Sequence, residues 1–447
     1  MTTAIGIILL ITYVLFAIYA AKGGNLMLGF FIMAVLWAGL GAIAGVTTWS
    51  VSPEQAANGA IDINNGIFEM GPELWGATAV IIIFGSWFGR ILIETGIART
   101  IIRTAVELSG DKPAITTILL ALVTSLIFTS AYGAGSVVAV GVIVFPILLS
   151  LGISKHLATS AYLMAVGAGL YLNTGWLKQV GALFPDFDFA TSSWKTFAFI
   201  AFGLQLLVTF AMITFSSKTE RKHAWAAQPA VRQQPAGGNE EKKVHVLAMI
   251  TPIIPVCLSI FLNVAPIPSI LIAIIWALIL TGNFKKFNET AALVQKTFKD
   301  GVVDVALVFA FLFFLQMFLR AAKVNAPLLA PILEPVLPSN LLILFVVFGL
   351  FSVLALFRGP LTLWGAGAAT LAMFQGIGGV FTAAVLLPLF IVPTTTVNGS
   401  ICPTQSWCLW AIGYTKTNLR DYFKTCLAWS LVLAFALEMI AYFMFAA

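Results

Sequence analysis

Long apolar runs alternate with short polar stretches along most of this 447-residue chain. Residues 4–21, 26–47, 194–215 and 425–445 are four such runs, and almost no charged residue interrupts them. A helix of about 20 apolar residues crosses the roughly 30 Å hydrocarbon layer of a membrane. The pattern therefore predicts an all-α polytopic membrane protein whose principal partner is the lipid bilayer.

A long polar stretch, residues 217–244, divides the chain near its middle. Its composition, rich in Pro, Gly, Ala and Gln, predicts a flexible cytoplasmic linker between an N-terminal repeat (1–216) and a C-terminal repeat (245–447). Apolar runs, polar stretches and glycine- or asparagine-containing breaks recur in the same order in both repeats, about 225–240 residues apart. We expect about five transmembrane helices plus one re-entrant hairpin in each. An odd number of crossings makes these two inverted repeats, an arrangement typical of transporters.

The composition supports the membrane assignment, since 60% of the residues are apolar and only 9% are charged. A soluble domain carries about a quarter charged residues. The net charge of +6 comes from basic residues in the linker and after apolar runs, which follows the positive-inside rule. We therefore expect no nucleic-acid partner.

Glycines interrupt an apolar run at matching places in the two halves, as "YGAGSVVAV" (132–140) and "LWGAGAATL" (363–371). Breaking a helix inside a membrane exposes backbone groups, which is tolerated where they face protein, water or a ligand. Close packing of small residues is the alternative interpretation. The duplication favours a substrate-binding site with these candidates: Ser130, Tyr132, Gly133, Gly135, Ser136, Thr362, Trp364, Gly365 and Gly367.

A second pair of breaks carries asparagine, in "YLNTGWLK" (171–178) and "PTTTVNGSICPTQS" (393–406). The preceding runs, 157–172 and 379–393, are short for full spans, which favours re-entrant hairpins over exposed turns. Unwound segments of this kind ligate Na⁺ and face anions in transporters. The further candidates are Asn173, Thr174, Gly175, Thr395, Thr396, Asn398, Gly399 and Ser400, and the possible Na⁺ ligands among them are Asn173, Thr174, Asn398 and Ser400.

One arginine, Arg358, follows a long apolar run and precedes Gly-Pro. Arginine at membrane depth is usually functional, and its guanidinium fork suits a carboxylate. A position at the membrane surface is the alternative. Intramembrane carboxylates and histidines, which a proton relay needs, are absent from the broken regions, and Glu438 in the last run is interpreted as structural. This favours Na⁺ over H⁺ as the coupling ion.

Two stretches resemble gluconate permeases, "FGSWFGRILIETGIARTIIRTAVELSGDKPA" (84–114) and "SWCLWAIGYTKTNLRDYFKTCLAW" (406–429). The organisation of the chain is similar to the ion transporter superfamily, which also includes citrate and C4-dicarboxylate carriers. The resemblance implies a multi-pass homodimer of the bacterial inner membrane. It also implies hairpin-tip or unwound-helix roles for residues 173–175 and 398–400. Gluconate permeases carry an acidic residue where this chain has Tyr132-Gly133, so neither gluconate itself nor a proton mechanism like theirs is expected.

These observations predict a secondary active transporter that couples symport of a small organic anion to Na⁺ or H⁺ by alternating access. Two alternatives remain open: an exporter or antiporter of a drug or amino acid, and a channel-like uniporter. An enzyme is not expected, because three scattered histidines supply neither a nucleophile–base set nor a catalytic metal site. No cofactor is expected apart from the coupling ion.

Overall fold

The computed structural model describes residues 2–109, 112–184, 186–221, 244–285, 287–335 and 340–446. Throughout these ranges the regular structure is helical. The predicted all-α class is confirmed. Most of the predicted linker, residues 222–243, lies outside the described ranges, and the helix before it extends past the predicted boundary at 216 to Arg221.

The helices of the N-terminal half are, in order, α1 (Thr2–Ala21), α2 (Leu26–Ile43), α3 (Pro53–Ala57), the π-helix η1 (Ile63–Glu69), α4 (Met70–Glu73), α5 (Gly76–Glu94), α6 (Ile97–Ser109), α7 (Pro113–Phe128), α8 (Ala134–Ser150), α9 (Lys155–Leu170), α10 (Thr174–Gly181) and α11 (Ser192–Arg221). Those of the C-terminal half are the 3₁₀-helix η3 (Val246–Ile253), α12 (Ile254–Phe261), α13 (Pro266–Leu280), the 3₁₀-helix η4 (Asn283–Lys285), α14 (Phe287–Leu333), α15 (Leu341–Leu350), the 3₁₀-helix η5 (Ser352–Arg358), α16 (Gly367–Ile377), α17 (Ala383–Val392), the π-helix η6 (Pro393–Gly399), α18 (Ser406–Thr415) and α19 (Leu419–Phe445).

Six helical stretches of the described chain are long and apolar enough to cross a membrane, or seven when the bent pair α15–η5 is counted as one span. The other apolar helices have only 10–17 residues. The expectation of about five full spans in each half therefore overestimates the unbroken helices. The difference arises because α7, α8 and α13 have only 16, 17 and 15 residues, and because other predicted spans are divided by internal breaks.

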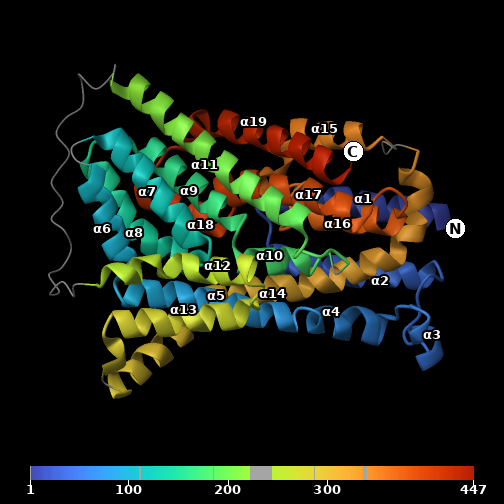
Figure 1. Ribbon diagram of the computed structural model, residues 1–447. Coiled ribbons are helices and arrows are strands. Elements are labelled where there is room, and N and C mark those ends of the chain that lie inside the picture. Colours follow the sequence, from blue (N-terminus) through green and yellow to red (C-terminus); the bar gives the residue numbers. More distant parts are fainter. Residues whose placement is uncertain are drawn as a thin grey trace.

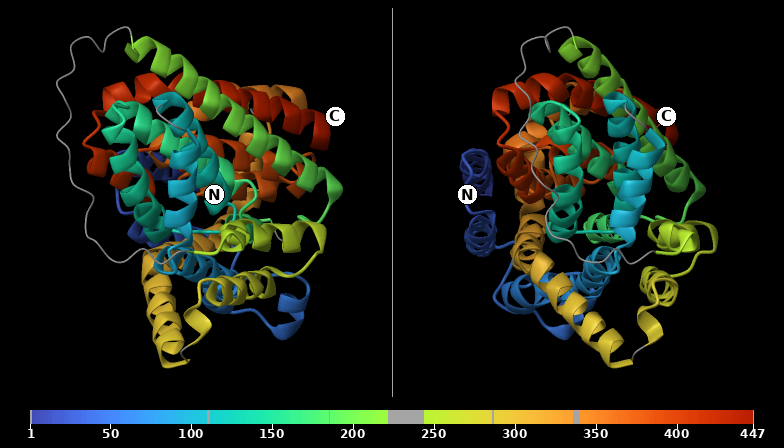
Figure 2. Two further views of the ribbon diagram at one scale, coloured as in Figure 1. Left: turned by 60° about the vertical axis from the view of Figure 1, so that its left-hand side comes forward. Right: turned by 90° about the vertical axis from the view of Figure 1, so that its left-hand side faces the viewer.

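The helices form two parts (Figures 1 and 2). α1 and α2 lie at one edge of a curved layer, and α12 and α13 lie at the other edge, with α5 and α14 between them. Helices α6–α11 and α15–α19 form a bundle above this layer. We call the two parts the layer and the bundle. The two apolar pairs that open the halves of the sequence thus belong to the same layer.

Each half places one helical hairpin in the bundle. α7 and α8 pack against each other in the left half of Figure 1, whereas α15 and α16 lie in its right half. The glycine-containing segments form the turns of these hairpins. Gly-Pro at 359–360 ends η5 because proline cannot donate a helical hydrogen bond.

Each half also contains one helix that is interrupted and then continues. α9 leads through residues 171–173 into α10, and α17 and η6 lead through residues 401–405 into α18. In Figure 1 the first runs from left to right and the second from right to left. The segments at which the chain reverses direction are therefore the glycine-containing ones. A reversal was expected at the asparagine-containing runs, but each of these runs continues into the next helix instead.

Candidate functional site

The tip of the first hairpin packs tightly against the layer. Gly133 has φ +93°, a conformation that side chains with a Cβ rarely adopt. At Gly135, a Cβ would lie 2.1 Å from the Asp304 carboxyl group. This carboxylate pairs with Arg90 through two 2.6 Å contacts, which joins α5 to α14. The glycines of the first segment thus allow the backbone to approach an ion pair of the layer.

The tip of the second hairpin uses its glycines differently. A Cβ on Gly365 would lie 2.2 Å from the Arg358 carbonyl oxygen, so glycine lets the turn fold back on itself. Phe357 and Arg358 have φ of +52° and +61°. Such conformations cost about 1–3 kcal/mol each and cluster at ligand-binding sites. The strained backbone directs Arg358 into a cavity.

Two buried asparagines connect each broken helix to the hairpin of its own half. The Asn173 amide donates to the carbonyls of Phe128 (2.8 Å) and Ala131 (2.9 Å), while its Oδ1 accepts from the N–H of Trp176 (2.9 Å). The Asn398 amide donates to the Ala355 carbonyl at 3.3 Å. Both side chains are fully buried, so these bonds fix the breaks relative to the hairpins.

The two broken helices contact each other directly. The hydroxyls of Tyr171 and Thr396 lie 2.7 Å apart, and the indole N–H of Trp176 donates to the Thr395 hydroxyl at 3.1 Å. Ser400 donates to the Thr395 carbonyl at 2.8 Å. Segments more than 200 residues apart in the sequence therefore meet through buried polar groups.

A cavity of ≈ 530 Å³ opens beside this crossing. A volume of this order suits a small organic ligand. Its wall combines the bundle of both halves with the layer. The residues that line it are Ala20, Gly23, Gly24, Leu26, Met27, Tyr132, Trp176, Gln179, Leu307, Val308, Phe311, Arg358, Trp364, Pro403, Thr404, Gln405, Ser406, Trp407 and Leu409.

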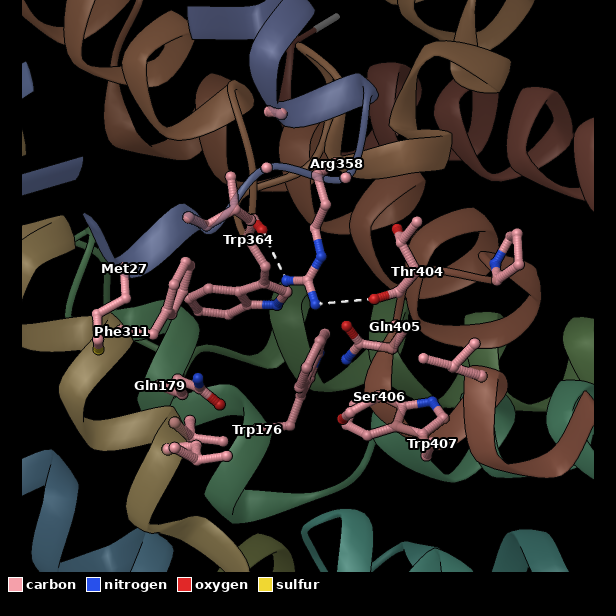
Figure 3. A pocket seen from close by; sticks show the side chains of 18 of the residues that line it. Met27, Trp176, Gln179, Phe311, Arg358, Trp364, Thr404, Gln405, Ser406 and Trp407 are labelled. Carbon is pink, nitrogen blue, oxygen red and sulfur yellow. Dashed lines mark hydrogen bonds between the residues drawn. The ribbon is translucent and has the colours of Figure 1, made fainter. Parts of the chain in front are cut away.

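Arg358 is the one charged side chain among these lining residues. Its guanidinium donates to the carbonyl oxygens of Trp364 and Thr404, each at 3.0 Å (Figure 3). A guanidinium has five N–H donors, so three remain after these two bonds. No carboxylate of the described chain forms an ion pair with Arg358. The geometry leaves a positively charged fork available to an anion.

Aromatic rings surround this positive charge. The Trp176 ring lies 5.6 Å from the Trp364 ring and 6.4 Å from the Trp407 ring, measured between centroids. Tyr132 lies 6.4 Å from Trp176 and donates its hydroxyl to Gln179. Figure 3 shows the guanidinium between Trp364 and Thr404, with Trp176, Gln405 and Trp407 below it. The site therefore combines one cation, two amides and extensive apolar surface.

Three of the sequence-predicted residues line the cavity: Tyr132, Arg358 and Trp364. The other candidates are not among its lining residues. Ser130 donates to the Pro252 carbonyl (2.6 Å), Ser136 to the Tyr132 carbonyl (3.0 Å), and Thr362 accepts from the Trp364 N–H (3.4 Å). Gly175 packs near Tyr132, and Gly367 approaches the backbone of Thr362.

The four predicted Na⁺ ligands have different surroundings. Asn173 holds the first hairpin. Asn398 lies with Gly399 in π-helix η6, before the break itself, and Ser400 accepts from Gln205 at 2.9 Å. Thr174 lines a second cavity of ≈ 330 Å³ on the opposite face of α10, together with Lys178. Within the described ranges, no hydrogen bond joins any two of these four side chains.

Several lining residues are not among the candidates from the sequence. Trp176, Thr404 and Gln405 lie within the two asparagine-containing segments, Gln179 and Trp407 lie just after them, and Phe311 lies far from both. Trp176 and Gln179 follow Asn173 by three and six residues, so they lie on one face of α10. Residues 404–407 lie at the end of the second asparagine-containing segment and directly after it. The polar character of these segments is therefore a signal for both groups, whereas the α14 residues Leu307, Val308 and Phe311 are apolar and give none.

Comparison with known proteins shows a similarity of fold and none of sequence. No protein-family model matches this chain, and no curated protein sequence does. A solved structure is similar to it: the crystal structure of the YdaH transporter of Alcanivorax borkumensis, described as having an unusual topology. The TM-score is 0.56 at 15% identity, over 93% of this chain and 97% of that one. The chain has a transporter-like fold. Together with its apolar helices, this indicates a multi-pass membrane protein.

Proposed function

We propose that this protein is a secondary active transporter that couples symport of a small organic anion, a carboxylate, to a cation by alternating access. The observation that carries the proposal is Arg358, a single cation in a cavity lined by both halves and the layer. Carboxylates bind guanidinium groups through paired, charge-assisted hydrogen bonds. Gln179 and Gln405 add neutral hydrogen-bonding groups beside it.

The arrangement of the bundle supports alternating access. α11 and α19, the last helices of the two halves, pack together and run in opposite directions (Figure 1). The hairpins of the two halves lie at opposite sides of the bundle in Figure 1, and the two broken helices run in opposite directions. We interpret this as two inverted repeats, an architecture in which one part rocks against another around a central site. The bundle is the proposed moving part, and the layer is the static one.

Further features of the proposal follow from this type of carrier. We propose Na⁺ or H⁺ as the coupling ion. We also propose that the protein belongs to the ion transporter superfamily, and that it forms a homodimer in a bacterial inner membrane. An exporter that carries a drug with an anionic group is the second candidate, since three tryptophans favour a partly apolar solute. Uptake and efflux assays in oriented vesicles distinguish the two.

Arg358→Ala should abolish carboxylate binding and uptake. Truncating one partner of a buried charge pair costs about 2–5 kcal/mol, and about 1.4 kcal/mol is tenfold in affinity. We therefore expect a loss of roughly 30-fold or more. Arg358→Lys should recover only part of it, because lysine keeps the charge and loses the planar fork.

The measurement is a thermal-shift screen of carboxylates on purified protein, followed by uptake into proteoliposomes. Arg99→Ala is the matched control, because Arg99 is exposed on α6. Full uptake by Arg358→Ala, with control-level amounts of folded protein, would reject a carboxylate site at Arg358.

A further inference from the structure

Glu438 is a fully buried carboxyl group near the end of α19. Neither of its oxygens has a hydrogen-bond partner among the described residues. Its side chain begins against α15, where a Cβ on Gly349 would lie 3.5 Å from the Glu438 Cβ. Buried polar side chains in proteins are almost always hydrogen-bonded, so this exception requires an explanation.

The titratable groups around Glu438 are two tyrosines. Tyr171 follows α9 and interacts electrostatically with Glu438, and Tyr442 lies one turn further along α19. Three packed elements, α15, α17 and η6, contain no titratable residue. The other packed elements carry their charged and titratable groups away from Glu438. In α9 these are Lys155, His156 and Tyr162, which precede its last two turns. In α11 Lys195 bonds to the α12–α13 turn, and in η5 Arg358 points into the cavity.

An ionised carboxylate is strongly disfavoured in such a place because it would lose its water and gain no counter-ion. The neutral, proton-carrying form needs no partner of opposite charge. Intramembrane acidic residues are rare and usually belong to ion or proton pathways. Glu438 in this conformation is therefore a carboxylic acid that holds a proton away from water.

A hydrogen-bonded path leads from the neighbourhood of Glu438 to the cavity. Ser430, two turns earlier on the same buried face of α19, donates to the Thr396 carbonyl at 2.7 Å. The Thr396 hydroxyl meets Tyr171 and Gln205, and Gln205 donates to Ser400. Ser400 and Trp176 both bond to Thr395, and Trp176 forms the cavity wall.

We propose that Glu438 is the proton-binding site that couples transport to the proton gradient. The proposal rests on the proposed transport function and specifies its coupling ion. The proton binds when a conformational change gives Glu438 access to water, and it stays bound while the carboxyl is buried between α19 and α15. The crossing of the broken helices links this site to the anion cavity. Neutralising the carboxyl allows the bundle to move with its bound anion.

The first test needs no substrate. Infrared difference spectra of the purified protein between high and low pH should show the C=O stretch of a protonated carboxyl group. The other Asp and Glu side chains also contribute to this band, so the Glu438 component is the part that Glu438→Gln loses. That component should shift in Glu438→Asp and persist in Glu54→Gln, whose carboxyl is exposed on α3. A spectrum identical in wild type and Glu438→Gln would overturn the proposal.

The second test measures coupling in proteoliposomes with a carboxylate found by thermal shift. Wild type and Glu54→Gln should accumulate it under a pH gradient without Na⁺. Glu438→Gln should lose that accumulation and still exchange labelled for unlabelled anion. Equal accumulation by Glu438→Gln, or accumulation that follows Na⁺ and ignores pH, overturns the proposal. If wild type transports no carboxylate, the proposed function fails, and the infrared band alone decides whether Glu438 holds the proton.

Discussion

At the residue scale, one asparagine in each half ties a broken helix to a hairpin. Asn173 and Asn398 lie 225 positions apart, and the amide of each donates to the hairpin of its own half: Asn173 to two carbonyls and Asn398 to one. The first also satisfies the N–H of Trp176 at the start of α10. Broken helices leave such backbone groups without partners. An amide side chain can serve a carbonyl and an N–H together, as Asn173 does. Asn398 serves only the Ala355 carbonyl, because its Oδ1 has no hydrogen-bond partner among the described residues.

Asn173→Ala should destabilise the protein strongly. The change removes three hydrogen bonds and leaves the Phe128 and Ala131 carbonyls with buried, unpaired lone pairs. Each such loss costs about 1–3 kcal/mol, so the total should exceed about 3 kcal/mol. The melting temperature of the detergent-purified protein measures the effect.

Asn340→Ala is the matched control. Asn340 also caps a helix, α15, by accepting from Leu342 and Ile343, but it is exposed. Removing an exposed N-cap costs about 1 kcal/mol. Equal melting temperatures for the two variants would show that the Asn173 bonds do not hold the hairpin.

The sequence identified polar and glycine residues at both breaks because breaks inside apolar runs are visible as patterns. Arg358, Tyr132 and Trp364 were found in this way. Trp176 and Trp407 were not found, because tryptophan in an apolar helix looks like any core residue until the helix has a neighbour. Phe311 could not be found at all, since its place in the cavity depends on how α14 packs against the bundle.

At the scale of elements, the duplicated Gly-Ala-Gly segments build two hairpin turns by different means. The first allows approach to another helix, and the second allows a chain reversal. The sequence located the turns and left two interpretations of the glycines open, close helix packing and a substrate-binding site. Both apply to the first segment, because Tyr132 lines the cavity while Gly135 packs against Asp304. The length of an apolar run alone did not show where the chain reverses direction: it reverses at the glycine-containing segments, and the asparagine-containing runs continue into the next helix.

Gly135→Ala should displace the first hairpin from the layer. The new methyl group would lie 2.1 Å from the Asp304 carboxyl, whose pairing with Arg90 fixes its position. Inserting a methyl group into a packed interior costs about 1–3 kcal/mol. We expect a lower melting temperature and slower uptake.

Gly39→Ala is the matched control, and it should leave the melting temperature unchanged or raise it. Gly39 lies inside α2, and a Cβ added there would have no atom within 4 Å. Alanine in a helix interior is about 0.5–1 kcal/mol better than glycine. A Gly135→Ala protein as stable and active as Gly39→Ala would show that contact with the Asp304–Arg90 pair is not needed.

At the scale of the whole molecule, the cavity lies where the layer meets the bundle. The layer contributes the α1–α2 turn and part of α14, and the bundle contributes Arg358 and the tryptophans. If the bundle moves against the layer during transport, contacts between α5 and the first hairpin must change. The repeated pattern of the sequence predicts two halves and an equivalent pair of apolar runs at the start of each, 4–47 and 246–281, which fit together in one static part. It did not predict that α5 and α14 lie between these pairs. That placement depends on long-range packing that the order of apolar runs does not specify.

A reversible cross-link between layer and bundle tests this motion. A Cβ on Gly85 of α5 would lie 3.5 Å from the Cβ of Tyr132, within the range of a disulfide. The double variant Gly85→Cys/Tyr132→Cys should therefore form a disulfide on oxidation. Oxidation should stop uptake because the hairpin can no longer leave α5, and a reductant should restore the uptake measured before oxidation.

The two single variants separate locking from the loss of either native residue. Tyr132→Cys alone removes the hydrogen bond to Gln179 and part of the cavity wall, so it sets the baseline for the reduced double variant. Neither single variant should respond to oxidation. Thermal shift with a carboxylate should still detect binding in the oxidised protein, since the cross-link holds the conformation in which the cavity exists. Unchanged uptake by a fully cross-linked sample would mean that the first hairpin stays on the layer, and that the moving part comprises the second hairpin and its neighbours.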